Sequence, residues 1–387
     1  MLATLSDLLA PLSFTEFLEA FRARKRMHIP ASDPTRAEVL FSWHDVDTLL
    51  SKHVLDETVK LMRDGMLIPR QLYTSNKGRR LNTRVFHDLL PQGVSIVVDE
   101  VQRLVPQINQ LCVAVERTMG IRTNANAYLS FAKGGAFKPH WDFMDVLVVQ
   151  VYGTKQWRVW NPVVLYPVAE SPSAKIDVSA SSDQELELKP GDVFFLPRGE
   201  PHSAAVSEGC SVHLTIGLLS YTGIDFFDSL RKEAAKVPLL RMDLPRHSPN
   251  EQSRTHEAAL KLQLHQLIDA ASISQFLLED DHSRSPALQT AVSSASPRMG
   301  DVLRLTLRRR VRFSDGVPDQ RSWPVAIGGE IRDLSAASKD VLQWLFDHDP
   351  TTFQELHGGL TPRHGHDSIE AAIRELRRFG FLTVIPD

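Results

Sequence analysis

The feature that most constrains this chain is the stretch of residues 124–160, in which a pair of potential metal ligands precedes two strand patterns. His140, Trp141 and Asp142 form a His-x-Asp triplet. Side chains alternate between the two faces of an extended chain, so His140 and Asp142 point the same way. The triplet therefore places an imidazole and a carboxylate side by side, which is half of a possible iron site.

Two strand patterns follow the triplet. Residues 145–152 are a mostly apolar run, residues 153–154 (Gly-Thr) fit a two-residue hairpin turn, and residues 155–160 are expected to return as the partner strand. On that second strand Lys155 shares a face with Trp157. If this face looks into a barrel, Lys155 is a buried cation, which is costly unless an anion meets it. We therefore expect a carboxylate-bearing cosubstrate beside Lys155.

A second histidine completes the ligand set from a distant part of the sequence. Residues 186–202 contain a tight turn, an apolar strand at residues 193–196 and a second turn that delivers His202. Short strands separated by turns favour a sandwich or barrel of the jelly-roll kind. Two histidines and one carboxylate on such a scaffold form the facial triad of non-haem iron oxygenases, which leaves three positions of an octahedral metal open. A closed zinc site would need a fourth protein ligand, and the sequence places none for it.

Length and composition limit the remaining possibilities. A chain of 387 residues exceeds one ordinary core and suggests two or three domains. A formal net charge of -3 argues against the strongly basic surface of proteins that bind nucleic acid or anionic membranes. The two cysteines cannot form a disulfide framework, and no run of about 18 apolar residues occurs. We therefore expect a cytoplasmic protein without a membrane segment.

The pattern changes from strand to helix after the apolar strand at residues 211–219. Residues 223–300 carry apolar positions at helical spacing and end in a Ser/Pro-rich linker at residues 283–300. In residues 301–387, helices that close on a terminal strand suggest a winged-helix module. The elements expected there are strands at 302–313, 323–331 and 381–385 and helices at 335–346 and 369–379.

Other histidines have simpler explanations than a metal site. His44 and Asp45 open an apolar helical pattern, and helix capping is the favoured interpretation. Residues 364–367 (His-Gly-His-Asp) stand just before a helix, where a capping loop is again favoured. His213 is expected to be an ordinary core or sheet-face histidine.

Several motifs together resemble one known family. They are NAY at 126–128, PHWD at 139–142, VVQVYGTKQWRVW at 148–160, KPGDVFFLPRGEPH at 189–202 and VHLTIG at 212–217. In this combination the chain resembles the JmjC ribosomal oxygenases, which are cupin-type protein hydroxylases dependent on 2-oxoglutarate and iron(II). The resemblance covers nearly the whole chain, and it is specific because the triad, the lysine and the Asn-x-Tyr motif all arrive at the family's spacing.

The resemblance implies a mixed α and β protein with three parts. Residues 1–222 would form a JmjC double-stranded β-helix (jelly-roll or cupin) with N-terminal helical elements. Residues 223–300 would form a helical dimerisation region and linker, and residues 301–387 a winged-helix domain. A homodimer is therefore expected, and nucleic acid is not expected as a partner.

The family's site residues carry over by motif. Three residues would bind Fe(II) and form the catalytic centre, namely His140, Asp142 and His202. Lys155 would pair with the distal carboxylate of 2-oxoglutarate, and Asn126 and Tyr128 would line the cosubstrate pocket. Gly217 stands where eukaryotic relatives have a serine that helps to hold the cosubstrate, with Thr215 nearby.

The implied reaction consumes 2-oxoglutarate and O2, releases succinate and carbon dioxide, and hydroxylates an unactivated carbon. The leading expectation is a hydroxylase of an arginine or histidine side chain in a ribosomal protein. An alternative substrate is a natural-product precursor peptide, whereas demethylation of N-methyl-lysine is less expected because the additional domains belong with the hydroxylases. From a different class, a winged-helix nucleic-acid binder with a ligand-sensing β-barrel stays open, although the arginines of residues 304–312 are expected on a solvated strand face.

Overall fold

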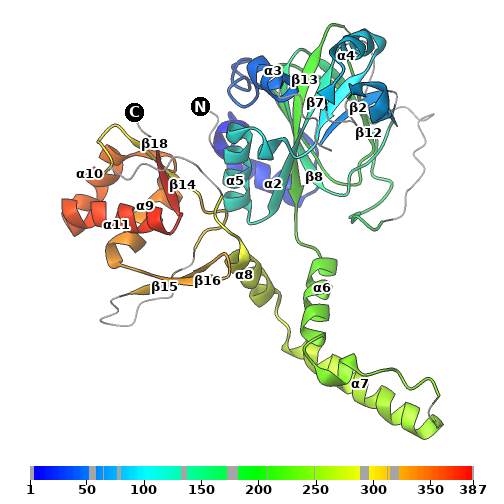
Figure 1. Cartoon of the computed structure of the whole chain (residues 1–387), viewed down its shortest axis with the longest axis vertical. Coiled ribbons are helices and arrows are strands. Elements are labelled where there is room, and N and C mark those ends of the chain that lie inside the picture. The colour runs from blue at the N-terminus through cyan, green and yellow to red at the C-terminus, as the bar shows by residue number, and fades with distance from the viewer. Residues whose placement is uncertain are drawn as a thin grey trace. The chain divides into compact units, whose positions relative to one another are not determined.

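The structure is a computed structural model that divides into two compact units, Met1–Leu219 and Ser220–Asp387 (Figure 1). Among the described residues, no helix combines the length and the apolar character that crossing a membrane requires. The residues that the structure describes are 4–51, 58–63, 65–75, 80–131, 137–171, 182–206, 208–247, 249–287, 296–311, 313 and 322–385.

Short helices accompany the barrel of the first unit. They are α1 (Leu5–Leu9), α2 (Phe14–Arg22), α3 (Trp43–Ser51), α4 (Thr83–Leu89) and α5 (Pro106–Met119), with single 3-10 turns at Arg70–Leu72, Leu90–Gln92 and Val101–Arg103. Before α3, the Asp45 carboxylate accepts the N–H of Ser42 at 2.7 Å, while the Ser42 hydroxyl accepts the N–H of Asp45. The predicted capping role of the His44–Asp45 pair is therefore confirmed for its aspartate.

Two antiparallel sheets form the barrel. The larger sheet has, in spatial order, β1 (Met27–Ile29), β11 (Val193–Leu196), β8 (Asp145–Tyr152), β13 (Ser211–Leu219), β7 (Arg122–Ser130), β6 (Ser95–Val98), β2 (Val59–Arg63) and β3 (Met66–Leu67). The smaller sheet has β10 (Gln184–Leu188), β9 (Lys155–Val159) and β12 (His202–Ala205), and β4 (Thr74–Ser75) pairs separately with β5 (Arg80–Leu81). The predicted mixed class with a jelly-roll barrel is confirmed.

The interior of the barrel is where the two sheets face one another. Apolar side chains from both sheets form one buried cluster, which includes Val146, Val148 and Phe194 from the larger sheet and Trp157, Val159 and Leu188 from the smaller one. A second and larger cluster lies between the larger sheet and the helices. Burial on both faces explains why β8 is a nearly continuous apolar run, as a strand covered on both sides requires.

The predicted hairpin at residues 153–154 is wrong. β8 pairs with β11 and β13, whereas β9 pairs with β10 and β12, so these two residues carry the chain from one sheet to the other. Gly153 has a φ of 62°, and a Cβ atom there would lie 2.0 Å from the carbonyl oxygen of Cys210. The crossing therefore requires glycine. The face alternation was correct, because three side chains of β9 are buried, namely Lys155, Trp157 and Val159.

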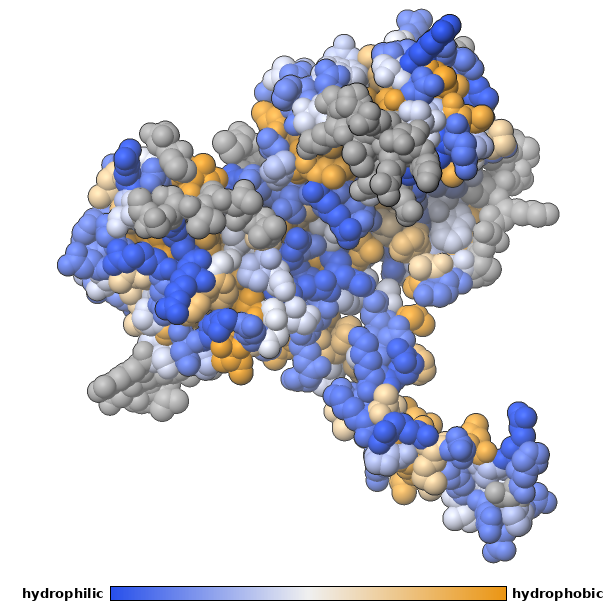
Figure 2. Space-filling view, viewed as in Figure 1, coloured by the Kyte–Doolittle hydropathy of each residue, from blue (hydrophilic) through white to orange (hydrophobic). Residues whose placement is uncertain are grey.

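The second unit begins with helices α6 (Gly223–Ala234), α7 (Asn250–Ala270) and α8 (Ile273–Ser283), and a 3-10 turn at Pro238–Arg241. The helical pattern predicted within residues 223–300 is interrupted at residue 271, between α7 and α8, and Ser272 caps α8 by accepting the N–H of Gln275. Figure 2 shows apolar residues on the visible surface of the part that carries α6 and α7. The exposed apolar side chains of these helices include Phe227 in α6 and Leu262 in α7, which are 63% and 60% exposed.

The C-terminal part of this unit has its own core. Its elements are β14 (Val302–Leu305), β15 (Trp323–Ile327), β16 (Glu330–Leu334), α9 (Ala336–His348), β17 (Thr351–Thr352), α10 (Phe353–His364), α11 (His366–Arg378) and β18 (Leu382–Ile385).

Three expectations for this part need correction. The strand predicted at residues 302–313 ends at Leu305. The strand predicted at residues 323–331 ends at Ile327, and residues 330–331 belong to the second strand of the β15–β16 pair. The helix α10 was not predicted, because its two glycines and its internal Pro362 weaken the helical signal. The expectation of a solvated arginine face is also wrong for Arg309, which is 6% exposed and pairs with Asp281 at 2.9 Å. Arg312 lies outside the described residues.

Candidate metal centre

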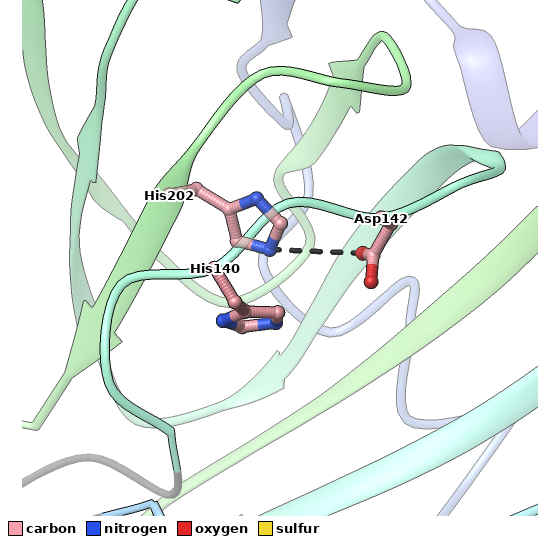
Figure 3. A group of neighbouring side chains, drawn as sticks. All are labelled: His140, Asp142 and His202. Atoms are coloured by element: carbon pink, nitrogen blue, oxygen red, sulfur yellow. Dashed lines mark ion pairs between the residues drawn. The ribbon is translucent and has the colours of Figure 1, made fainter. Parts of the chain in front are cut away.

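Three side chains converge at one end of the barrel, and they are those of His140, Asp142 and His202 (Figure 3). One ligand atom of each lies within 4.8 Å of the others, and this is the only group of its kind among the described residues. The Nε2 atom of His202 lies 3.7 Å from a carboxylate oxygen of Asp142. The structure thus brings together the two ligands of the His-x-Asp triplet and a histidine that stands 60 residues later in the sequence than Asp142.

Backbone hydrogen bonds fix these three positions. His140 and His202 form an isolated antiparallel bridge, with N–H to O distances of 3.1 and 2.8 Å. The N–H of Gly199, in the turn before β12, donates to the carbonyl oxygen of Asp142 at 2.9 Å. The turn that the sequence predicted to deliver His202 therefore also holds Asp142, and the ligands do not depend on mobile side-chain contacts for their placement.

The rings of both histidines are oriented by main-chain oxygens. The Nδ1 atom of His140 lies 2.9 Å from the carbonyl oxygen of Lys138, and that of His202 lies 3.1 Å from the carbonyl oxygen of Glu200. A proton on each Nδ1 leaves Nε2 as the free donor atom, which is the usual arrangement for a metal-binding histidine. Burial lowers the pKa of His202, so its neutral, ligating form is favoured.

The donor set fits a divalent iron ion. Two neutral imidazoles and one carboxylate on a rigid scaffold are the protein ligands of the facial triad, and no fourth histidine, cysteine or carboxylate joins the described group. The side chain of Asp142 is 34% exposed while that of His202 is 6% exposed, so the ligand group is accessible from the Asp142 side. Such a site can hold a metal and still accept further ligands.

A cavity of about 50 Å³ adjoins the triad. Both sheets contribute to its wall, which consists of Tyr128, Phe137, His140, Asp142, Val146, Val148, Lys155, Trp157, His202, Ala204, His213 and Thr215. The wall is mainly apolar and aromatic, with one cation. This combination suits a small anionic ligand whose remaining surface is carbon.

Lys155 is buried in this wall, with only 1% of its surface exposed. Its ammonium group lies 3.3 Å from the hydroxyl oxygen of Ser130 and 3.3 Å from Nδ1 of His213. Both partners are uncharged acceptors, and no carboxylate among the described residues pairs with Lys155. Burial lowers the pKa of Lys155 to about 7. The cavity therefore contains a cationic group whose charge is left for a ligand to meet.

His213 is a site residue that the sequence did not indicate. It is a buried histidine of a sheet face, as expected, but that face lines the cavity. Its ring stacks on the ring of Tyr128, with 4.8 Å between centroids and 7° between planes. Burial and the neighbouring Lys155 hold the pKa of His213 well below its ordinary value. A lone histidine in a strand gives no sequence signal of such contacts, which arise from the pairing of β13 with β7 and β8.

Of the two residues predicted to contact the cosubstrate, Tyr128 lines the cavity and Asn126 does not. Tyr128 lines the cavity, and burial raises its pKa, so it stays a neutral hydrogen-bonding group. Asn126 is absent from the cavity wall. Its amide oxygen accepts the N–H of Glu100 at 2.9 Å, and its side chain hydrogen-bonds to Tyr128. Asn126 and Tyr128 lie two residues apart on the same face of β7, so Asn126 is connected to the cavity through Tyr128, and its place in the lining of the cosubstrate pocket stays a prediction.

Gly217 occupies a position without room for a serine. A Cβ atom there would lie 2.2 Å from the amide oxygen of Asn124 and 2.4 Å from the sulfur of Met144. A serine would therefore need both side chains to move. Thr215, two residues earlier on the same face of β13, lines the cavity instead.

Comparisons with known proteins point to one family. Residues 98–226 match the family model of the JmjC domain. Over 218 residues, the chain is 26% identical to the bifunctional lysine-specific demethylase and histidyl-hydroxylase NO66 of Drosophila persimilis, covering 55% of this chain and 31% of that protein. Over 342 residues, it is 26% identical to ribosomal oxygenase 2 of Rattus norvegicus, covering 81% of this chain and 72% of that protein.

A solved structure is also similar to the chain. It is that of YcfD, a ribosomal oxygenase from Escherichia coli, in complex with cobalt and 2-oxoglutarate. The two have 17% sequence identity and a TM-score of 0.55, over 97% of this chain and 98% of that chain. At this identity the likeness shows the fold alone. The chain spans less than half the length of the first curated relatives that it matches.

Proposed function

We propose that the chain is a 2-oxoglutarate- and Fe(II)-dependent oxygenase that hydroxylates one side chain of a ribosomal protein, and the match of residues 98–226 to the JmjC domain model supports this proposal. The observation that carries the proposal is the buried Lys155, which has no carboxylate partner and shares one small cavity with the triad. The names of the rat and Escherichia coli proteins support a ribosomal substrate. Neither a precursor peptide nor a nucleic-acid sensor is favoured by these observations.

The triad residues would hold the metal. His140 and His202 would each bind it through Nε2, and Asp142 through its carboxylate. When bound, iron(II) supplies the activation of O2 that lets the enzyme hydroxylate an unactivated carbon with conversion of 2-oxoglutarate to succinate and carbon dioxide. The hydrogen bonds of the two Nδ1 atoms to main-chain oxygens keep both imidazoles in the ligating orientation.

Lys155 would bind the distal carboxylate of 2-oxoglutarate. An ammonium group has three N–H donors, of which two point to Ser130 and His213. Because these acceptors are neutral, they orient the ammonium group without neutralising it, and the remaining donor is left for the ligand. The Ser130 hydroxyl is itself fixed by Ser95, at 2.7 Å. This arrangement selects a 2-oxo acid with a second carboxylate over one without it.

The aromatic wall would keep water away from the reacting groups. The ring of His213 contacts those of Tyr128 and Trp157, with centroid distances of 4.8 and 5.6 Å. A low local dielectric strengthens the interaction of Lys155 with a carboxylate. His213 accepts from Lys155 through Nδ1, so its proton would reside on Nε2. Asn126 would act as a positioning residue, because it holds Tyr128.

The proposal also assigns a role to each part of the chain. Residues 1–222 would be the catalytic domain, residues 223–300 a dimerisation region and linker, and residues 301–387 a winged-helix domain in a cytoplasmic protein. The exposed apolar side chains of α6 and α7, among them Phe227 and Ile268, support pairing with a second copy of the chain. Light scattering after size-exclusion chromatography tests this, with a dimer expected and a monomer counting against it.

Activity is tested with the full chain, iron(II), 2-oxoglutarate and O2. We expect succinate to form, and we expect one ribosomal protein to gain a single oxygen atom in mass spectra of ribosomes from wild-type cells compared with cells that lack the protein. Absence of succinate under all conditions would refute the oxygenase. Succinate formation with an unchanged ribosome would refute the ribosomal substrate and favour a peptide substrate.

A further inference from the structure

Unusual backbone conformations gather around the metal-bearing end of the barrel. Three non-glycine residues among those described have a positive φ, namely Arg24 (54°), Glu100 (52°) and Tyr166 (51°). Glu100 donates its N–H to the side chain of Asn126, which hydrogen-bonds to the cavity residue Tyr128. Arg24 and Tyr166 contact one another, with the guanidinium carbon 5.8 Å from the ring centroid. Bulky side chains rarely adopt this region, and where they do the conformation is held by surrounding contacts and is often functional.

The loop that carries Tyr166 leaves the barrel at the same end as the metal ligands. His202 pairs with Val159, the last residue of β9, so the chain after Val159 starts beside a ligand. The loop then packs on the turn that holds Asp142. A Cβ atom on Gly199 would lie 2.2 Å from the carbonyl oxygen of Val164. The N–H of Gly199 is the group that donates to Asp142.

A clamp fixes the ring of Tyr166. The guanidinium carbons of Arg24 and Arg198 lie 5.8 and 6.0 Å from its centroid, which is within cation–π range. Arg24 makes a bidentate pair with the fully buried Asp145, at 2.9 and 2.7 Å, and Asp145 also accepts the N–H of Arg198 at 2.8 Å. Asp145 begins β8, three residues after Asp142. The ring is therefore connected to the ligand group through short, rigid contacts.

This end of the barrel exposes a set of apolar and aromatic side chains, which we call the aromatic rim. Most of Tyr166 remains exposed (64%) although it is clamped. The positive charge of Arg24 is offset by Asp145, so the rim offers an aromatic face. Its members are Phe143, Val163, Leu165 and Tyr166, with exposed fractions of 39%, 44%, 74% and 64%.

We propose that the aromatic rim is the docking surface for the protein substrate, an inference that rests on the proposed function. The cavity lies between the two sheets and is lined by side chains of both, so a substrate side chain that reaches the triad leaves the main chain of the substrate around the mouth. The rim binds an extended segment that carries an apolar or aromatic side chain near the modified residue. That side chain packs on Tyr166 and Leu165. A preorganised exposed aromatic ring loses little entropy on binding and is a typical hot spot.

The test compares three variants of the full chain. Tyr166→Ala removes the ring, Tyr166→Phe retains it, and Tyr152→Ala is the matched control. Tyr152 is 43% exposed and stands at the other end of β8 from Asp145. Two quantities are measured for each variant. The first is the KM for ribosomes from cells that lack the protein, from the single-oxygen gain of the substrate. The second is the affinity of the manganese(II)-loaded chain for 2-oxoglutarate, by calorimetry.

We expect Tyr166→Ala to raise the KM for ribosomes about tenfold while the affinity for 2-oxoglutarate changes less than twofold. Tyr166→Phe and Tyr152→Ala should both stay near the wild-type values. A wild-type KM for Tyr166→Ala would overturn the docking surface and leave the proposed function intact. So would an equal loss in both measurements, because the ring would then serve only the structure. If the wild-type chain binds no 2-oxoglutarate or modifies no ribosomal protein, the proposed function fails, and the inference fails with it.

Discussion

Histidines and carboxylates come together in the barrel and at the junction of α10 and α11, and of these two clusters only the one in the barrel resembles a metal site. In the barrel, His140 and Asp142 come from the segment before β8, and His202 is the first residue of β12. At the junction of α10 and α11, His357 contacts His366 at 2.8 Å, His366 faces Glu370 at 3.3 Å, and His364 faces Asp340 at 2.8 Å.

The two clusters differ in the hydrogen-bond partners of their histidine ring nitrogens. In the barrel, Nδ1 of both histidines contacts a main-chain carbonyl oxygen. The two Nε2 atoms therefore remain available for a metal beside the carboxylate of Asp142. At the helix junction the ring nitrogens contact side chains. Both nitrogens of His366 are used in this way, by His357 and Glu370. The sequence motif His-x-Asp or His-Gly-His-Asp is therefore less informative than the scaffold that orients it, because only the scaffold decides which atoms remain available.

The largest effect should separate the two clusters directly. We expect His140→Ala to lower 2-oxoglutarate turnover by more than the roughly 100-fold that the loss of an outer-sphere partner costs, because only two ligands remain for the metal. His366→Ala should retain full turnover. Succinate formation and the iron content of the purified proteins are the measurements. Equal activity of the two variants would remove the distinction between the clusters.

The next largest effect is expected for Lys155, the buried cation of the barrel site. Lys155→Met should weaken 2-oxoglutarate binding about 100-fold, since loss of one partner of a buried charge pair costs roughly 2–5 kcal/mol. The control is Lys236→Met, because that lysine is exposed and pairs with Glu233 at 2.7 Å. Calorimetry with 2-oxoglutarate and with 2-oxopentanoate, which lacks the distal carboxylate, measures the effect. A similar loss for both ligands in Lys155→Met would contradict the assigned role.

Above pH 7, the dissociation constant for 2-oxoglutarate should rise about tenfold per pH unit. Burial lowers the pKa of Lys155 to about 7, so the ammonium group is present below pH 7 and is lost as the pH rises through that value. The distal carboxylate binds only the charged form. The dissociation constant for 2-oxoglutarate should therefore be nearly constant from pH 6 to 7 and rise above it, by about tenfold per unit. Calorimetry across this range tests the sign, and stronger binding at higher pH would exclude a protonated Lys155 as the anchor.

The smallest effect is expected at the helix junction itself. Asp340 pairs with Arg363 at 2.7 Å and with His364 at 2.8 Å, and its side chain is 15% exposed. Asp340→Asn should lower the free energy of unfolding by roughly 1 kcal/mol and leave turnover unchanged. Urea denaturation measures the first quantity and succinate formation the second. Reduced turnover in a folded Asp340→Asn protein would show that the second cluster takes part in function.

Some of the candidate site could be predicted from local chemistry. Alternation in extended chain is enough to place His140 and Asp142 on one side and to turn Lys155 inward, since both inferences depend on neighbours two residues apart. The turn before His202 was also recognisable from its proline and glycine. Helix capping explained Asp45, because a cap is decided within three residues.

Other features depended on long-range pairing and were missed or wrong. Residues 153–154 have the chemistry of a hairpin turn, yet the chain crosses to the second sheet, because each strand finds its hydrogen-bond partners elsewhere in the sequence. His213 entered the site only through the register of β13. The contacts of the Asn126 amide group with Glu100 and Tyr128 likewise arise from tertiary structure. The helix α10 forms because its apolar side chains are buried in the C-terminal core despite two glycines and a proline.

The sequence by itself determined the ligand types, their side-by-side presentation and the need for an anion near Lys155, since all three follow from covalent spacing and from the cost of burying charge. The tertiary structure alone decided that β9 joins a second sheet, that His213 and Ser130 orient the ammonium group, and that Gly199 links the rim loop to Asp142. Such decisions depend on strand register and close packing between distant segments, and no local pattern encodes which segments will meet.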